Sequence, residues 1–263
     1  GRVRSAPSVG LPSVVNWVTA GMVTPVKNQG YCGSCWAFST AETFESQWAM
    51  NGNALWEFSV QQIASCTSNC YGCGGGLTEN AYDYIKSQIG LGSAAWGPYV
   101  QSMTESCSFR RCTESCDNFN MTVLSTSAFY TGPYASVISY AYTNPPCKIG
   151  SCASQNTTQL AAAVATNGPA SVCVNAANWG DYTGGVLSQA ACGGYAYSNL
   201  DHCVQLTGYN AGATNPYWLV RNTWATNWGE KGYIRVARTD NDHQVLLQYD
   251  TADWARQIGR ASC

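Results

Sequence analysis

The feature that most constrains this chain is an apolar run with helical spacing that begins at the second of two closely spaced cysteines. From Cys35 onward, apolar residues recur every three or four positions, and Asn51-Gly52 supplies a stop signal. This pattern predicts a helix whose first turn holds Cys35, with Ser34 as its N-cap. A helix N-terminus carries roughly half a positive charge, which makes a thiol there easier to deprotonate. Cys35 is therefore a candidate nucleophile.

A thiol nucleophile needs a base, and the sequence offers two candidates because it contains only two histidines. His202 follows Asp201 at the start of an alternating segment that is typical of a strand. His243 lies in a polar stretch that is typical of a solvated turn. We therefore favour His202 as the base.

Composition excludes some classes of function. Only 11% of the residues are charged and the net charge is -2, so the chain has no basic field for nucleic acid. No apolar run reaches the ~18 residues that suggest a membrane span, and the N-terminus lacks the apolar core of a signal peptide. We expect no nucleic-acid partner and no membrane association.

The cysteine count indicates an oxidising compartment. Fourteen cysteines in a chain with few charges are typical of the secretory pathway. Two sequons, at Asn120 and Asn156, fit that location and are candidate glycosylation sites. If Cys35 stays reduced, thirteen cysteines remain, and an odd number cannot all pair within the chain.

The first half of the chain is predicted to be mainly helical and the second half mainly strands. After the helix at Cys35, Ser59 and Gln62 form a candidate capping box, and 78–89 has a helical pattern. In the second half, 159–165 is predicted to be helical. Predicted strands follow; they span 170–174, 202–207, 217–222 and 232–237.

Several segments occur together in the order found in one known family. The segment Gln29–Ser39, which contains Cys-Gly-Ser-Cys-Trp, resembles the nucleophile segment of papain-like cysteine peptidases. The other matching segments are Leu11-Pro12 to Asn16-Trp17, Val23–Gln29, Cys73–Gly76, Asn167–Pro169, Asp201-His202, Gly208-Tyr209, Tyr217–Trp224, Trp228–Glu230 and Gly232-Tyr233. The resemblance covers Leu11 to about Val236, thinly between Cys107 and Gln159.

The resemblance implies catalytic roles. Cys35 would be the nucleophile and His202 the proton carrier, in a thiolate-imidazolium pair. Asn222 would orient the imidazole, with Trp224 shielding their hydrogen bond from water. Gln29 and the backbone N–H of Cys35 would stabilise the oxyanion. No cofactor and no metal are implied.

The resemblance also implies substrate contacts. Gly75 and Gly76 would let the substrate backbone lie against the cleft wall. The pocket for the residue two before the scissile bond would be apolar and select an apolar side chain there. The expected substrate-binding residues are Gly75, Gly76, Leu77, Thr78, Cys173, Leu200, Asp201 and Trp224, with Tyr249 as a candidate for the pocket floor. Because a cysteine is unusual there, Cys173 is our candidate for an additional unpaired thiol.

The family's disulfides suggest Cys32 with Cys73 and Cys66 with Cys107. His202 lies farther from Cys35 than the ~130–150 residues usual in the family, which indicates insertions, chiefly between Tyr130 and Asn156. The histidine-rich occluding loop of some relatives would need histidines that this chain lacks, which favours endopeptidase action.

The implied fold is α+β and two-lobed, with a helical N-terminal lobe, a β-barrel-like C-terminal lobe and the active-site cleft between them. We expect a lead-in or propeptide remnant over 1–10, the helical lobe over 11–120 and the β lobe over 121–263. Expected partners are protein and peptide substrates, the enzyme's own propeptide and cystatin-like inhibitors, with the chain a monomer. The expected location is a lysosome, a digestive vacuole or the extracellular space.

Two other functions remain open at this point. Cys32 and Cys35 form a C-x-x-C pair before a helix, as in thiol-disulfide oxidoreductases. No βαβ pattern precedes the pair, however, and redox chemistry leaves His202 and Asn222 unexplained. The third possibility is a catalytically silent papain-like protein used for binding or storage. The presence of the candidate nucleophile Cys35 argues against it.

Overall fold

The computed structural model describes residues 10–88, 90–100, 116, 132–144, 156–188, 191 and 199–238, and the backbone of 248–257. The chain divides into two compact units. One consists of Gly1–Lys27 and Ala141–Thr251, and the other of Asn28–Tyr140 and Ala252–Cys263. We call them the strand-rich unit and the helical unit and describe each by itself.

The helical unit is built around α1 (Cys35–Met50). This helix is buried on all sides, since every residue from Cys35 to Ala49 is buried. Asn51 ends it as predicted, with its backbone N–H bonded to Gln47 O. Ser34 occupies the N-cap position, but its side chain makes no capping hydrogen bond.

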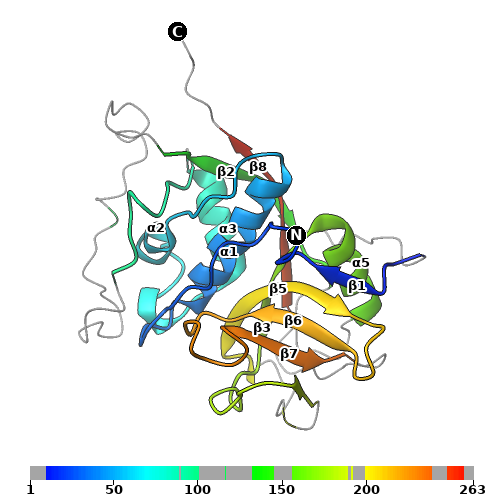
Figure 1. Cartoon of the computed structure of the whole chain (residues 1–263). Coiled ribbons are helices and arrows are strands. Elements are labelled where there is room, and N and C mark those ends of the chain that lie inside the picture. Colours follow the sequence, from blue (N-terminus) through cyan, green and yellow to red (C-terminus); the bar gives the residue numbers. More distant parts are fainter. Residues whose placement is uncertain are drawn as a thin grey trace. The chain divides into compact units, whose positions relative to one another are not determined.

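Three short helical elements follow α1 in this unit, and the two α-helices among them lie beside it (Figure 1). They are α2 (Val60–Cys66), the 3₁₀ turn η1 (Gly72–Gly74) and α3 (Thr78–Ser87). Ser59 caps α2 by accepting the N–H of Gln62 at 3.0 Å, as predicted. The Gln62 side chain does not complete the capping box. It accepts the N–H of Gly92 at 2.9 Å and donates to the Tyr84 hydroxyl at 3.1 Å.

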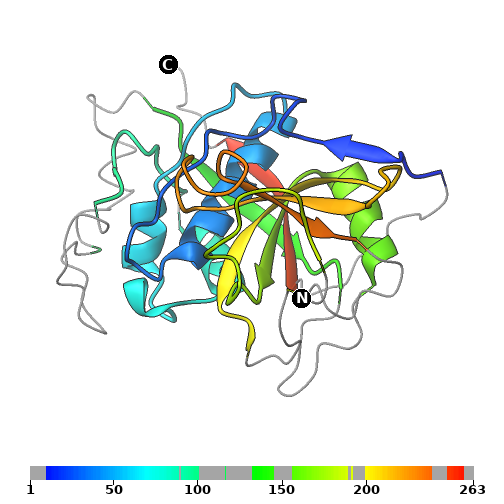
Figure 2. The same ribbon diagram turned by 60° about the horizontal axis from the view of Figure 1, so that its bottom comes forward.

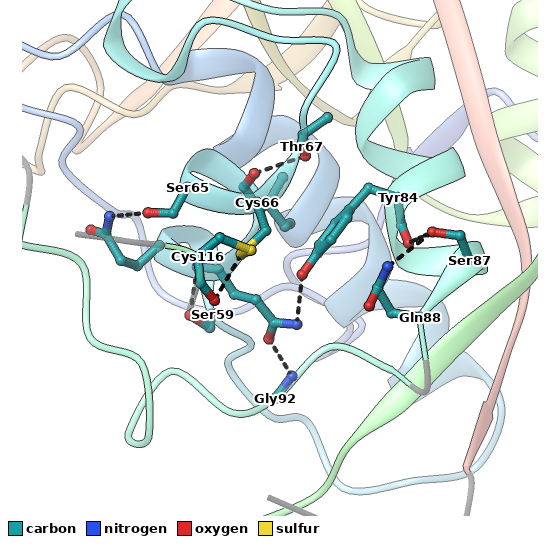
Figure 3. The surroundings of a disulfide bond; sticks show 12 residues. Ser59, Ser65, Cys66, Thr67, Tyr84, Ser87, Gln88, Gly92 and Cys116 are labelled. Atoms are coloured by element: carbon teal, nitrogen blue, oxygen red, sulfur yellow. Dashed lines mark hydrogen bonds between the residues drawn. A yellow bond between two sulfur atoms is a disulfide. The ribbon is translucent and has the colours of Figure 1, made fainter. Parts of the chain in front are cut away.

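Two disulfides of the helical unit lie within the described residues. Cys32 bonds to Cys73, as the resemblance implied. Cys66 bonds to Cys116, so the expected pairing of Cys66 with Cys107 is wrong (Figure 3). The Cα atoms of Cys66 and Cys116 lie 4.9 Å apart, within the range that a disulfide requires. Spacing alone does not reveal which cysteine of a dense stretch reaches the end of α2.

The strand-rich unit is a mainly antiparallel sheet. Its central strands are β3 (Ala170–Val174), β5 (His202–Asn210), β6 (Tyr217–Arg221) and β7 (Tyr233–Ala237), adjacent in that order as predicted for the last three. At one edge β4 (Val186–Leu187) pairs in parallel with β7, and β1 (Val14–Asn16) pairs with β5. The first residues of β8 (Gln248–Gln257) pair with β3. The strand β2 (Ala135–Ala141) lies almost wholly in the helical unit.

Helix α5 (Thr157–Asn167) lies beside the strands of this unit (Figure 2). Its apolar side chains join the core of the unit. It begins earlier than the predicted 159 because Asn156 caps it, with Oδ1 accepting the N–H of Gln159 at 2.9 Å. Leu160 and Val164 pack in one cluster with alternate residues of β3 and β5. The buried members of the cluster are Leu160, Ala161, Val164, Ala170, Val172, Val174, Ala176, Trp179, Tyr182, Val204, Leu206, Tyr209, Trp218, Val220, Ile234 and Val236.

The N-terminal segment belongs to the strand-rich unit. Val14–Asn16 pair with Gly208–Asn210, and the buried guanidinium of Arg221 donates hydrogen bonds to Thr24 and to Pro25 O. These contacts place the segment up to Lys27 with the strands. The predicted lobe boundary between 120 and 121 and most of the predicted lead-in lie outside the described residues.

Candidate active site

Cys35 is the first residue of α1 and is not joined in a disulfide. It is 9% exposed and stands at the end of the helix where the backbone N–H groups point outward. Gln29, 7% exposed, belongs to the same unit, and its Nε2 donates to the Cys32 carbonyl at 2.9 Å. The candidate nucleophile and the candidate oxyanion donor therefore lie on one continuous segment.

Cys32 forms a structural disulfide. Its disulfide with Cys73 is accompanied by a hydrogen bond from Gly33 N to Cys73 O at 3.0 Å. A Cβ on Gly33 would stand 2.5 Å from that carbonyl oxygen, so only glycine permits this approach. Because Cys32 is bonded to Cys73, the C-x-x-C reading as a Cys32/Cys35 redox pair loses its support.

The glycine-rich segment after Cys73 packs against the residue that follows the nucleophile. A Cβ on Gly76 would lie 2.6 Å from the Trp36 ring, and Gly75 has a φ of +110°. These constraints explain both glycines without a substrate. Leu77 is exposed and Thr78 is buried, so among these two predicted pocket residues only Leu77 offers a substantial surface.

A second thiol outside disulfides, Cys70, lies beside this segment. Its Sγ accepts the N–H of Leu77 at 3.4 Å and lies 3.7 Å from the Asn80 side-chain amide. Burial raises the pKa of the Cys70 thiol, so it is protonated at neutral pH.

His202 opens β5 and is 5% exposed. Its Nε2 lies 2.7 Å from Asn222 Oδ1. An amide oxygen only accepts, so Nε2 is the donor, and the neutral ring is then the tautomer with a lone pair on Nδ1. Asn222 is itself held in place, because its backbone N–H donates to Gly232 O at 2.9 Å. The fold thus brings together two residues that are 20 positions apart in sequence.

Aromatic rings surround the His202 imidazole. Trp224 stacks on it with a centroid distance of 5.0 Å and an interplanar angle of 29°. Trp179 meets it edge-on at 6.0 Å and stacks on Trp228. Trp179 was not predicted from the sequence, since it lies in a loop without periodicity. The His202–Asn222 hydrogen bond is thus buried beside these rings, since His202 is 5% exposed and Asn222 is fully buried.

Asp201 fixes the backbone immediately before the imidazole. Its Oδ1 accepts the N–H of Ala176 at 2.8 Å, and its own N–H donates to Val174 O at 3.1 Å. Leu200, the other predicted pocket residue here, is half-buried. Asp201 therefore holds the loop after β3 to the start of β5.

Cys173 is not an unpaired thiol, contrary to expectation. It bonds to Cys203, the residue directly opposite it in the β3–β5 ladder. The register pairs Cys173 with Cys203 and Val174 with His202, so the two sulfur atoms lie on one face of the sheet and the imidazole on the other. The sequence alone could not show this pairing, because it depends on the register between β3 and β5.

Arg235 and Glu230, which follow Asn222 in the sequence, form an ion pair in the strand-rich unit. Arg235 donates from Nε and Nη2 to the two carboxylate oxygens of Glu230, at 2.8 and 2.5 Å. These charged hydrogen bonds hold the pKa of Glu230 below its usual range. Glu230 Oε1 also accepts the N–H of Gly185, so the carboxylate joins two loops.

The predicted site residues thus form two groups, one in each unit. Gln29, Cys35, Gly75, Gly76, Leu77 and Thr78 belong to the helical unit, and Cys173, Leu200, Asp201, His202, Asn222 and Trp224 to the strand-rich unit. His243, Cys107 and Asn120 lie outside the described residues, and the side chain of Tyr249 is not described. Across the described part of the chain, no cluster of acidic, cysteine or histidine side chains could hold a metal ion, and none of the helices could cross a membrane.

Comparisons with known proteins agree on one family. Residues 11–252 match the model of the papain family cysteine protease domain. The chain is 38% identical over 254 residues to cysteine proteinase A of Leishmania mexicana, covering 93% of this chain and 59% of that protein. It is 35% identical over 232 residues to a cysteine proteinase of Trypanosoma brucei brucei, covering 88% of this chain and 44% of that protein. The chain thus spans about half the length of these relatives.

A solved structure supports the expected fold. The bromelain protease of Ananas comosus, in complex with the inhibitor E64, superposes with a TM-score of 0.69 at 29% identity. The match covers 91% of this chain and 97% of that one. This likeness confirms the expected α+β fold of the papain type.

Proposed function

Because the chain belongs to the papain family of cysteine proteases, we propose that it is a cysteine endopeptidase that acts through an acyl-enzyme on Cys35. The observation that carries the proposal is a cysteine outside disulfides at the first residue of α1, whose neighbour Cys32 is bonded elsewhere. A thiolate at a helix N-terminus is stabilised by the dipole, and cysteine is the most nucleophilic side chain at neutral pH.

In the proposed reaction His202 carries the proton. In the resting pair the Cys35 proton resides on Nδ1 of His202, while Nε2 keeps its hydrogen bond to Asn222 Oδ1. The thiolate attacks the scissile carbonyl carbon, and the displaced electron pair moves to the carbonyl oxygen. When the tetrahedral intermediate collapses, the C–N bond breaks and the leaving amine takes the proton from His202.

Hydrolysis of the thioester repeats these steps with water. His202 removes a proton from water, the hydroxide attacks the thioester, and the thiolate leaves. Gln29 Nε2 and the backbone N–H of Cys35 would donate to the oxyanion in both halves. Loss of one such donor typically costs about 2.7–4 kcal/mol of transition-state stabilisation.

We further propose a preference for an apolar side chain two residues before the scissile bond. By resemblance to the family, Leu77, Leu200 and Cys173 would supply the apolar surface; Cys173, as half of a disulfide, carries neither charge nor a strong hydrogen-bonding group. Asp201, whose Oδ1 accepts the N–H of Ala176, would border the site.

The proposed partners and location follow from the family. They are protein and peptide substrates, the enzyme's own propeptide and cystatin-like inhibitors, with the enzyme acting as a monomer. The disulfides at Cys32, Cys66 and Cys173 support an oxidising compartment, either a lysosome or digestive vacuole or the extracellular space. Glycosylation at Asn156 is compatible with its exposed position and with a cap that uses Oδ1 rather than the amide nitrogen.

The test is active-site labelling combined with a proteolysis assay. An unfolded protein substrate is incubated with the enzyme at mildly acidic pH, with and without an epoxide that alkylates papain-type thiols. We expect proteolysis to be abolished in proportion to a label that peptide mapping places on Cys35. Absence of proteolysis from a folded, unlabelled chain would instead indicate the silent relative.

A pair of histidine variants tests the choice of base. His202→Ala is expected to abolish turnover, whereas His243→Ala should leave kcat nearly intact. Equal losses in the two variants would contradict the assignment of His202.

A further inference from the structure

The hydroxyl of Tyr99 bridges Gln29 and Ser34, two residues of the segment that leads to Cys35. Tyr99 Oη lies 3.0 Å from the backbone oxygen of Gln29 and 2.6 Å from Ser34 Oγ. A carbonyl oxygen only accepts, so the single Tyr99 proton goes to Gln29. Ser34 must then donate to Tyr99. The hydrogen bonds run in one direction, from Ser34 through Tyr99 to Gln29.

The Tyr99 ring is anchored on the helix that Cys35 begins. It packs edge-on against Phe38, with centroids 4.7 Å apart and an interplanar angle of 72°. Phe38 is 2% exposed, and its backbone N–H donates to Ser34 O. The Tyr99 ring therefore packs against the first turn of α1. The hydroxyl is thereby held in a fixed place.

The Ser34 side chain bonds to Tyr99 instead of capping α1. Its side chain makes no N-cap hydrogen bond, although it precedes α1 and is fully buried. A serine at this position normally bonds to the second or third helical N–H. The side chain of Ser34 therefore serves the link to Tyr99.

We propose that Tyr99 is a positioning residue for the oxyanion donors of the proposed peptidase reaction. Gln29 is held at two points, by Tyr99 at its carbonyl and by the Cys32 carbonyl at its Nε2. Ser34, on the other side of the link, is bonded covalently to Cys35, whose N–H is the second donor. The Tyr99 hydroxyl thus sets the distance between the two donors. This inference rests on the proposed function.

The test compares Tyr99→Phe with a matched tyrosine variant of the same unit. Tyr99→Phe keeps the ring on Phe38 and removes only the hydroxyl. Tyr84→Phe also removes a hydroxyl that has a hydrogen bond, in this case from Gln62. We expect Tyr99→Phe to lower kcat about tenfold with KM changed less than about twofold, because misplaced donors weaken transition-state binding. Tyr84→Phe should leave kcat unchanged.

Two inhibitors separate this role from a general structural effect. A peptide aldehyde adds to the thiolate and forms an oxyanion at the former carbonyl, whereas an epoxide alkylates the thiolate without one. Tyr99→Phe should weaken aldehyde binding about tenfold and leave the rate of epoxide alkylation within about twofold. Equal losses with both inhibitors would show a general disturbance of Cys35 and overturn the inference.

Ser34→Ala provides a second, independent variant. It should lower kcat by a smaller factor than Tyr99→Phe, and the double variant should be no worse than Tyr99→Phe alone, since both act on one chain of hydrogen bonds. If the kcat losses of the two single variants add up in the double variant, Ser34 and Tyr99 do not act through one chain of hydrogen bonds. A wild-type protein without proteolysis overturns the proposed function and this role with it. An active wild type with an unaffected Tyr99→Phe variant overturns the positioning role alone.

Discussion

Removal of the Cys173–Cys203 disulfide should measurably destabilise the chain. The bond joins residues 30 apart in sequence. In the chain-entropy model a closed loop of that length lowers the entropy of the unfolded chain by about 12 cal/mol/K, which corresponds to about 3.6 kcal/mol at 25 °C. The double variant Cys173→Ala/Cys203→Ala is therefore expected to lose about 3–4 kcal/mol of unfolding free energy.

The folded state should change little in this variant. Val172 pairs with Val204 and Val174 with His202 on either side of the bond, so backbone pairing keeps the register without the disulfide. The loss then arises mainly from the greater freedom of the unfolded chain. A small additional cost comes from the two buried sulfur atoms.

The assay is equilibrium unfolding in urea, followed by tryptophan fluorescence. A Cys35→Ala background removes the candidate nucleophile and so prevents self-digestion. Cys70→Ala, which removes a thiol outside disulfides, is the control. A reductant strong enough to break the bond in the unfolded chain should abolish the difference between the parent and the double variant. A loss below about 1 kcal/mol, or a difference that survives reduction, would refute the loop-closure argument.

Three further changes have expected outcomes. Glu230→Gln removes a carboxylate whose pKa is lowered by Arg235; its stabilisation is present above the unfolded pKa and is lost as pH falls through the folded pKa. The variant should therefore be less stable by about 0.5–1 kcal/mol at pH 7 and match the parent near pH 2 in urea unfolding, and a gap that persists in acid would contradict this. Gly232→Ala places a Cβ against Val26 at a φ of +90° and should cost about 2–3 kcal/mol in the same assay, whereas an unchanged midpoint would mean that the loop relaxes freely. Trp224→Ala uncovers the hydrogen bond of the candidate base and should lower kcat about tenfold, or about 1.4 kcal/mol, in steady-state kinetics; a kcat within twofold of the parent would show that shielding is unimportant.

Local signals allowed the helices and central strands to be predicted. Helix α1 ends at its predicted stop, Asn51-Gly52, where Gly52 takes a φ of +85° that other residues rarely adopt. Strands β5, β6 and β7 were recognisable because apolar residues alternate along them and turn residues separate them. These features depend on neighbours in sequence, which a single sequence displays.

Features that depend on distant residues were not predictable in the same way. The partner of Cys66 depends on which cysteine the fold brings to the end of α2, and the partner of Cys173 on the β3–β5 register. Trp179 contacts His202 and Tyr99 bonds to Gln29, and both lie in loops where the sequence has no hydrophobic periodicity to indicate such a contact. Ser34 was correctly placed at the start of α1, but its side chain bonds to a tyrosine 65 residues away rather than to the helix.

The pairing of β1 with β5 has a consequence for the order of events during synthesis. Val14–Asn16 must wait for Gly208–Asn210, almost two hundred residues later, before their ladder can close. Helix α1 needs only its own sixteen residues and near neighbours, and local structure forms well before such long-range pairing. On a growing chain the proposed nucleophile would therefore be in place while its base is still to be made. The proposed pair of Cys35 and His202 could form only after the strands that carry His202 and Asn222 have emerged.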